Sequence, residues 1–185
     1  MGEVKKMSWI LKLDEYPYTS YSRESKNGSR HYNCDGVHVP SVTTILDKTD
    51  DKSNLKKWIK RVGEEEAERI KVESSTRGTQ MHEFIENRLL GHQLELVDYQ
   101  PSLAHKMGST VLNNLIGLNF VYGTEISLNY KNLWAGSADL VCLYENQLTI
   151  GDFKQANKMK KEEWITNYFC QLVAYSMAHS EMYNE

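Results

Sequence analysis

The sequence predicts an α/β or α+β fold in which helices pack around a small sheet. Two changes along the chain support this prediction. Residues 54–118 carry apolar side chains at helical spacing, whereas residues 119–156 form short β-branched or aromatic runs separated by turn residues. A long helical pattern then closes the chain. With 185 residues, the chain is long enough to bury a core as one domain, or as one domain with appendages.

Composition narrows the setting but leaves the function open. Hydrophobic residues make up 40% and charged residues 25%, as in an ordinary soluble globular protein. The three cysteines, Cys34, Cys142 and Cys170, form no C-x-x-C, so neither a zinc knuckle nor a disulfide framework is predicted. We expect Cys142 and Cys170 to be small core residues. The net charge of −3 does not by itself indicate a nucleic-acid binder.

No apolar run has the length of a membrane span, and the N-terminus lacks a signal-peptide core. These features predict a protein without a membrane partner or targeting signal. With a reducing setting inferred from the cysteines, we expect a cytoplasmic location, in a bacterium or a phage-infected cell.

The N-terminal third predicts an arm, a hairpin and a short helix. Residues 1–30 are polar and favour an irregular arm with room for one short strand. In "HYNCDGVHV", residues 31–39, Asp35-Gly36 supplies the positive φ of a hairpin turn. Ser41 is a plausible N-cap of the helix that follows, and its hydroxyl with the free backbone N–H groups of a helix start could instead bind a phosphate.

Helices are predicted over residues 54–73, 75–91 and 101–118, with Gly91 as a stop signal and Pro101 in a first turn. Three strands, over residues 119–130, 133–144 and 147–156, form an antiparallel meander, and a final helix covers residues 160–183. The chain ends at "YNE" directly after this helix. Either its C-terminal part is truncated or the natural protein is short, and the sequence leaves both open.

Acidic residues interrupt the apolar runs of the predicted meander. Asp152 and Lys154 lie two apart, which places them on one strand face, and the turn at Glu145-Asn146 brings Asp139 beside Asp152. Glu125, on the preceding strand, offers a third carboxylate. Such a cluster suits Mg²⁺ or Mn²⁺, because packed carboxylates repel one another without a cation.

A bound metal would polarise a phosphoryl oxygen, and Lys154 would steer the attacking water and offset charge that develops on phosphorus. The alternative is a solvated ion-pair ladder. Asp/Glu-x-Lys occurs four times in the chain, so the tripeptide alone indicates little. A purely structural strand, however, usually stays apolar where "LTIGDF" does not.

Four pieces occur in an order that resembles the PD-(D/E)xK nucleases, and within them the RecB-like exonucleases: "RGTQMHEFIE", "GSAD", "GDFK" and "QLVAY". They cover roughly residues 77–179. The "VPSVTTIL" element and the basic, tryptophan-containing helix after it look more narrowly like the mitochondrial genome maintenance exonuclease and its phage-encoded relatives. The Pro of the family motif is absent, since Ser137-Ala138 precede Asp139.

The resemblance implies a restriction-endonuclease-like α/β fold, in which helices flank a small central mixed sheet with an antiparallel meander. An N-terminal hairpin and helices precede that sheet. It also implies a division into residues 1–50, the arm, hairpin and short helix, and residues 51–185, the nuclease core. The iron–sulfur relatives need four clustered cysteines, so no such cluster is expected.

The resemblance also assigns roles residue by residue. The implied metal ligands, for one or two Mg²⁺ or Mn²⁺ ions, are Asp139, Asp152, the Phe153 carbonyl and His82. The implied catalytic residues are Lys154, Asp152, Asp139 and Glu125. The implied substrate-binding residues are Gln171, Tyr175 and Arg77. His82 has a structural alternative as a hydrogen-bonded helix histidine, and Gln171 and Tyr175 have one as packing residues.

Two basic segments are candidates for nucleic-acid binding. "LKKWIKR" places Lys57 beside Trp58, and "KQANKMKK" holds Lys154, Lys158, Lys160 and Lys161. Single-strand binders combine such charges with aromatic platforms. The alternative for the first segment is an amphipathic helix with Trp58 in the core.

The sequence therefore predicts a divalent-metal-dependent DNA exonuclease that acts on single strands or DNA ends, in replication, repair or recombination. The alternatives are an inactive single-stranded DNA-binding module on a nuclease fold and a structure-specific endonuclease. Protein partners and polarity of digestion are not predicted.

Overall fold

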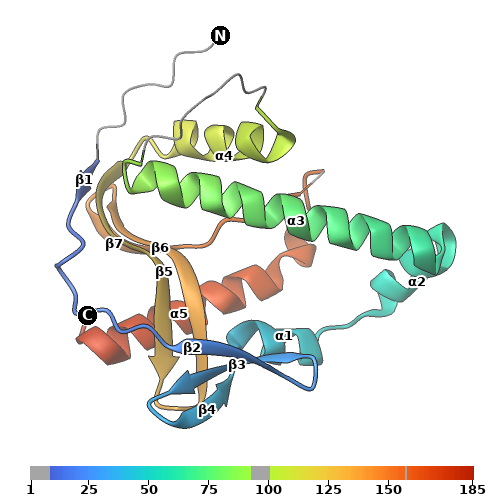
Figure 1. Ribbon diagram of the computed structural model, residues 1–185, viewed down its shortest axis with the longest axis horizontal. Coiled ribbons are helices and arrows are strands. Elements are labelled where there is room, and N and C mark those ends of the chain that lie inside the picture. The colour runs from blue at the N-terminus through green and yellow to red at the C-terminus, as the bar shows by residue number, and fades with distance from the viewer. Residues whose placement is uncertain (1–8, 93–100, 157) are drawn as a thin grey trace. The chain divides into compact units, whose positions relative to one another are not determined.

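The computed structural model describes residues 9–92, 101–156 and 158–185. Within them, two sheets and five α-helices make a mixed α/β protein (Figure 1). Contacts divide the chain into a sheet unit, residues 9–49 and 117–185, and a helical unit, residues 50–92 and 101–116. The hairpin thus groups with the main sheet. The predicted functional division at residue 50 stays a prediction.

The main sheet of the sheet unit has the order β1-β5-β6-β7. β5 (Leu118–Tyr130), β6 (Trp134–Tyr144) and β7 (Gln147–Gly151) form the predicted antiparallel meander. β1 (Ile10–Leu11) pairs with β5 in parallel, so the sheet is mixed. Both residues of the predicted turn, Glu145 and Asn146, have positive φ (49° and 64°), which lets two neighbouring strands join through a tight turn.

A second sheet contains β2 (Ser22–Lys26), β3 (Ser29–Cys34) and β4 (Val37–Pro40) in antiparallel order. The predicted hairpin is β3–β4, and Asp35 and Gly36 in its turn have φ of 53° and 88°. The predicted arm had room for one short strand, whereas the structure has two in that range, β1 and β2. The position of β2 carried no signal, because all five of its residues are exposed and show no apolar alternation.

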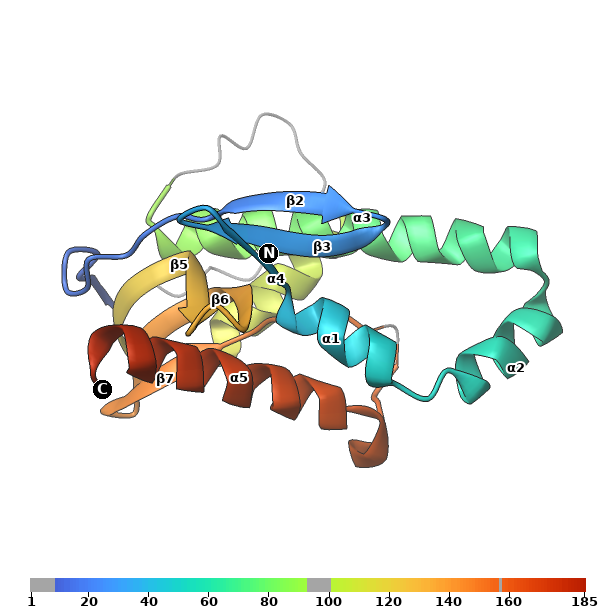
Figure 2. The ribbon, with the colours of Figure 1, turned by 90° about the horizontal axis from the view of Figure 1, so that it is seen from below.

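α1 (Val42–Thr49) and α5 (Thr166–Tyr183) complete the sheet unit. α5 lies along the main sheet, and α1 packs beside α5 (Figure 2). Their shared core contains Val42, Tyr122, Ile126, Leu128, Ala138, Val141, Tyr175 and Ala178. Leu128 and Val141 are fully buried, and burial of such a side chain stabilises by roughly 1.5–3 kcal/mol.

The closing helix is shorter than predicted. Residues 162–164 form one 3₁₀ turn, and Ile165, with φ −115° and ψ 8°, separates it from α5. Cys142 is buried as expected, but Cys170 on α5 is exposed, so its prediction as a core residue is wrong. A helix with few charged residues is difficult to orient from sequence, because several of its faces look apolar.

The helical unit contains α2 (Ser53–Val62), α3 (Glu64–Leu89) and α4 (Leu103–Asn114). The prediction of one helix over residues 54–73 is wrong, because α2 and α3 are separated at Gly63, whose φ of 91° favours glycine. Gly91, with φ 78°, follows the end of α3 as predicted.

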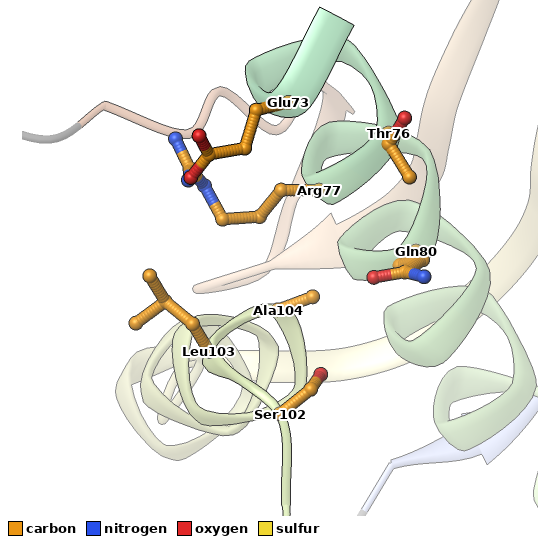
Figure 3. Close-up of a pocket in the computed structure, with 7 residues that line it drawn as sticks. All are labelled: Glu73, Thr76, Arg77, Gln80, Ser102, Leu103 and Ala104. Atoms are coloured by element: carbon orange, nitrogen blue, oxygen red, sulfur yellow. The ribbon is translucent and has the colours of Figure 1, made fainter. Parts of the chain in front are cut away.

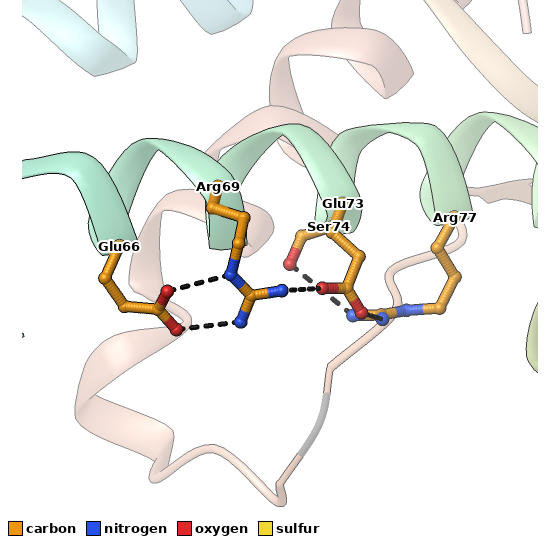
Figure 4. Close-up of polar contacts among 5 residues, drawn as sticks. All are labelled: Glu66, Arg69, Glu73, Ser74 and Arg77. Atoms are coloured by element: carbon orange, nitrogen blue, oxygen red, sulfur yellow. Dashed lines mark hydrogen bonds and ion pairs between the residues drawn. The ribbon is translucent and has the colours of Figure 1, made fainter.

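α3 continues through the predicted gap near residue 74 because side-chain pairs three and four residues apart span it (Figure 4). Glu66 accepts two 2.8 Å hydrogen bonds from Arg69, whose Nη1 lies 3.2 Å from Glu73. Arg77 Nη1 lies 3.4 Å from the other oxygen of Glu73. The exposed pairs of this ladder contribute little individually, but all of them favour the helix.

α4 packs along α3. The Ser102 hydroxyl accepts a 3.3 Å hydrogen bond from the His105 N–H and caps α4, so Pro101 precedes the cap and does not lie in the first turn as predicted. A Cβ on Gly108 would lie 2.6 Å from the Phe84 ring, so the helices approach closely there. Among the described residues, no helix is both long and apolar enough to cross a membrane.

Candidate functional site

Two acids lie level on neighbouring strands of the sheet unit. β5 pairs Ile126 with Ala138 of β6, so Glu125 is opposite Asp139. One carboxylate oxygen of each lies within 4.8 Å of the other. Glu125 has φ 50°, uncommon for a non-glycine residue inside a strand span, and the Ser137 hydroxyl donates a 2.9 Å hydrogen bond to its Oε2. The backbone thus holds an unfavourable conformation where the two carboxylates meet.

A third acid follows the end of β7. The β6–β7 register pairs Leu140 with Gly151, which brings Asp152 level with Asp139. The Phe153 N–H donates a 2.5 Å hydrogen bond to Asp139 Oδ2. The Asp139 side chain thus accepts the Phe153 N–H, which would otherwise bond to the backbone of the neighbouring strand. The strand predicted to reach residue 156 accordingly ends at Gly151. The ligand role of the Phe153 carbonyl stays a prediction.

Asp152 is held from two sides. Its side chain is only 6% exposed, and Lys154 Nζ forms an ion pair with Oδ2. From α5, Gln171 Nε2 donates a 2.8 Å hydrogen bond to Oδ1 and lies 3.1 Å from the Tyr175 hydroxyl. Burial raises the pKa of Tyr175 well above its ordinary value, so its hydroxyl stays protonated. A nearly buried carboxylate is therefore oriented by one cation and one amide.

Gln171 and Tyr175 are themselves buried, at 6% and 3% exposure. Their hydrogen bonds give them a direct part in orienting Asp152. Their predicted contact with substrate stays a prediction. The helical spacing of four residues correctly placed both on one face, but it did not reveal which group that face would contact.

Ser41 acts as the cap of α1. The Thr44 N–H donates a 3.0 Å hydrogen bond to its Oγ, and Oγ donates in turn to Thr44 Oγ1 at 2.9 Å. The residue is 1% exposed. The cap accounts for Ser41, so we leave it out of the proposed site.

Four predicted site residues belong to the helical unit. Lys57 is exposed and Trp58 half-buried on α2, and His82 is half-buried on α3. Arg77, also on α3, is 9% exposed, with its guanidinium 3.4 Å from the Ser74 hydroxyl and 3.4 Å from Glu73. A common site of these residues with the carboxylates stays the prediction of the resemblance.

The helical unit also holds a cavity of about 330 Å³ between α3 and α4 (Figure 3). Its lining residues are Glu73, Thr76, Arg77, Gln80, Ser102, Leu103 and Ala104. The acid of this set, Glu73, already pairs with Arg69 and Arg77. We therefore assign no metal chemistry to the cavity.

Comparison with models of known protein families gives no match for this chain, and no curated protein matches it. The resemblance to the PD-(D/E)xK nucleases rests on the motifs alone. The geometry of the carboxylates is independent of that resemblance.

Sequence reasoning missed two contributors to the site. Ser137 donates a hydrogen bond to Glu125. The sequence did contain a signal for Ser137, because it lies two residues before Asp139 and therefore on the same strand face. Tyr168 lies against Lys154, with the ammonium 5.6 Å from its ring centroid. No spacing in the sequence links these two, because a loop and a 3₁₀ turn separate them.

Proposed function

We propose that the protein is a divalent-metal-dependent phosphodiester hydrolase that acts on DNA as an exonuclease. The observation that carries the proposal is the set of three acids level across β5, β6 and the end of β7, with Lys154 paired to Asp152. Acids inside a small sheet rarely serve its packing. Their arrangement suits a cation and a reacting phosphate.

The donor set fits a hard cation. Mg²⁺ binds oxygen at about 2.0–2.1 Å, so two oxygens on one ion lie at most about 4.2 Å apart. The Glu125 and Asp139 oxygens, within 4.8 Å of each other, need to move by less than about 1 Å to take opposite positions on one ion. A carboxylate has about four lone-pair sites, so Asp152 can accept from Gln171 and Lys154 and still offer oxygen to an ion.

The chain's residues have separable roles. Asp139 and Asp152 would hold the cation, with Glu125 beside them, and a bound Mg²⁺ or Mn²⁺ would supply phosphoryl polarisation and acidified water. Lys154 orients the attacking water and offsets the charge that develops on phosphorus. The water oxygen bonds to phosphorus, the bond to the departing sugar oxygen breaks, and the proton lost by water ends on that oxygen.

The resemblance supports the finer parts of the proposal. It supplies DNA as substrate, exonuclease action on single strands or ends, the restriction-endonuclease-like fold and a ligand role for His82. The mixed sheet and the meander are compatible with that fold. The roles of His82 and Arg77 depend wholly on the resemblance.

The test is digestion of single-stranded DNA labelled at one end, with Mg²⁺ and Mn²⁺ compared and EDTA as the blank. The wild type should release labelled nucleotides only with metal. Asp152→Asn and Lys154→Ala should abolish release. Matched controls come from other Asp/Glu-x-Lys copies in the chain, Asp50→Asn and Lys26→Ala, and should cleave as the wild type does.

A closed circular single strand distinguishes exonuclease from endonuclease action, because an exonuclease leaves it intact. Full activity in Asp152→Asn or Lys154→Ala would eliminate the proposed mechanism. So would release that persists in EDTA.

A further inference from the structure

The segment after β7 carries lysines and aromatic rings outward from the carboxylates. Lys154, paired with Asp152, lies 5.6 Å from the Tyr168 ring centroid. Lys160 lies 4.8 Å from the same ring, and its ammonium contacts the Tyr168 hydroxyl. Tyr168 thus lies between the site lysine and a lysine of the surface. We call residues 158–168 the basic–aromatic segment.

The segment ends in an exposed indole. Trp164 is 56% exposed, and Lys161 Nζ lies 5.4 Å from its ring centroid, within cation–π range. The Trp164 backbone N–H donates a 3.0 Å hydrogen bond to the Lys161 carbonyl, so the 3₁₀ turn holds the two residues together. Tryptophan usually contributes by burying its ring. Here the residue stays 56% exposed to water.

From these contacts, we propose that the basic–aromatic segment binds single-stranded nucleic acid, with an unpaired base stacked on Trp164 and phosphates bound by Lys160 and Lys161. This inference extends the proposed function, because it assigns the strand selectivity of the same site. An exposed ring can stack on a base that is splayed out, whereas the bases of a duplex stack on one another. Single strands are therefore favoured over duplexes.

The charges of the segment are compatible with a phosphate backbone. Lys158, Lys160 and Lys161 are exposed, and Glu162 and Glu163 lie in the same stretch. Glu163 is 3.8 Å from Lys161, but both side chains are about two-thirds exposed, and such a surface pair is weak. A phosphate can replace Glu163 as the partner of Lys161 at small cost. The lysines thus stay available to a strand.

The test measures binding without cleavage, by fluorescence anisotropy in EDTA, with fluorescein-labelled oligothymidine and a duplex of equal length. Trp164→Ala should weaken single-strand binding about tenfold, the order of one lost base stack, and leave duplex binding unchanged. Trp164→Phe should keep most of the affinity. Phe169→Ala is the matched control, since Phe169 is 54% exposed and no described lysine lies over its ring.

Salt dependence tests the lysines separately. Each of Lys160→Gln and Lys161→Gln should reduce the slope of log K against log salt by about 0.7, the value for one phosphate contact on a single strand. Thermal unfolding of every variant should match the wild type, because the substituted side chains are partly or fully exposed. An unchanged slope in both variants would contradict phosphate binding by this segment.

The outcomes distinguish this inference from the proposed function. Trp164-dependent single-strand binding without metal-dependent cleavage would support the inference and overturn the nuclease. Cleavage with Trp164→Ala binding as tightly as the wild type would support the nuclease and overturn the inference. Equal weakening by Trp164→Ala and Phe169→Ala, or of duplex and single strand alike, would also overturn it.

Discussion

Replacing Gln171 by leucine tests whether this amide holds the site carboxylate. The substitution keeps the approximate volume but removes the 2.8 Å hydrogen bond to Asp152 Oδ1 and the contact with the Tyr175 hydroxyl. The Asp152 side chain is 6% exposed, so little water replaces the lost donor. A hydrogen bond to a charged group contributes about 1.5–3 kcal/mol. We therefore expect a loss of about 2 kcal/mol in the free energy of unfolding.

Thermal unfolding followed by circular dichroism measures this loss. For a chain of this size, 1 kcal/mol shifts Tm by about 2–4 °C, so Gln171→Leu should lower Tm by about 4–8 °C. Gln147→Leu is the matched control, because Gln147 is exposed, and it should change stability by less than about 0.5 kcal/mol. If Asp152 is a metal ligand, Mn²⁺ affinity should also fall about 10–100-fold in Gln171→Leu.

A double-mutant cycle with Asp152→Asn isolates the pair. We expect a coupling energy of about 1 kcal/mol, within the range for residues in contact. A Tm within about 1 °C of the wild type for Gln171→Leu, with coupling near zero, would refute the orienting role of Gln171.

Three further predictions follow from burial and backbone geometry. His179 is 1% exposed, and burial lowers its pKa below 6.5, so the unfolded chain binds a proton more readily than the folded one. The free energy of unfolding, measured by urea titration, should therefore fall as pH drops below about 6.5, and His179→Phe should remove this pH dependence. Glu125 has φ 50°, a backbone conformation that glycine adopts more easily than alanine, so the Glu125→Gly variant should be about 1 kcal/mol more stable than Glu125→Ala. This order is the reverse of the usual one inside a strand. In native protein, the exposed Cys170 should react with a thiol reagent at pH 8, whereas Cys142, whose pKa burial raises to about 12, should react only after unfolding.

The meander could be predicted because its signals are local. Each strand has a β-branched or aromatic run, and the Glu145-Asn146 turn lies directly between two of them. The α2–α3 boundary was not predicted, because its signal is not local. Gly63 and Gly78 look alike in sequence, yet Gly78 stays helical inside α3 and Gly63 adopts a backbone that ends α2. Which glycine breaks a helix depends on packing that a sequence pattern does not contain.

The site was predicted in part for a similar reason. Strand alternation and one turn sufficed to bring Asp139 level with Asp152. The prediction that Asp152 and Lys154 share one strand face is wrong, because both residues lie past the end of β7, although Lys154 does pair with Asp152 there. The left-handed backbone of Glu125 carried no signal, because glutamate is not a residue that favours positive φ.

Each of the three acids accepts a hydrogen bond from a residue that comes later in the chain. Glu125 on β5 accepts from a donor on β6, and Asp139 on β6 accepts from a donor just after β7. Asp152, which also follows β7, accepts from a donor on α5. The donors, in that order, are Ser137 Oγ, Phe153 N–H and Gln171 Nε2. Like charges at this spacing repel, and the donors offset part of that repulsion. The carboxylates therefore reach their arrangement only when the meander and α5 have all folded, which is why motifs within single elements reveal the acids and not the groups that hold them.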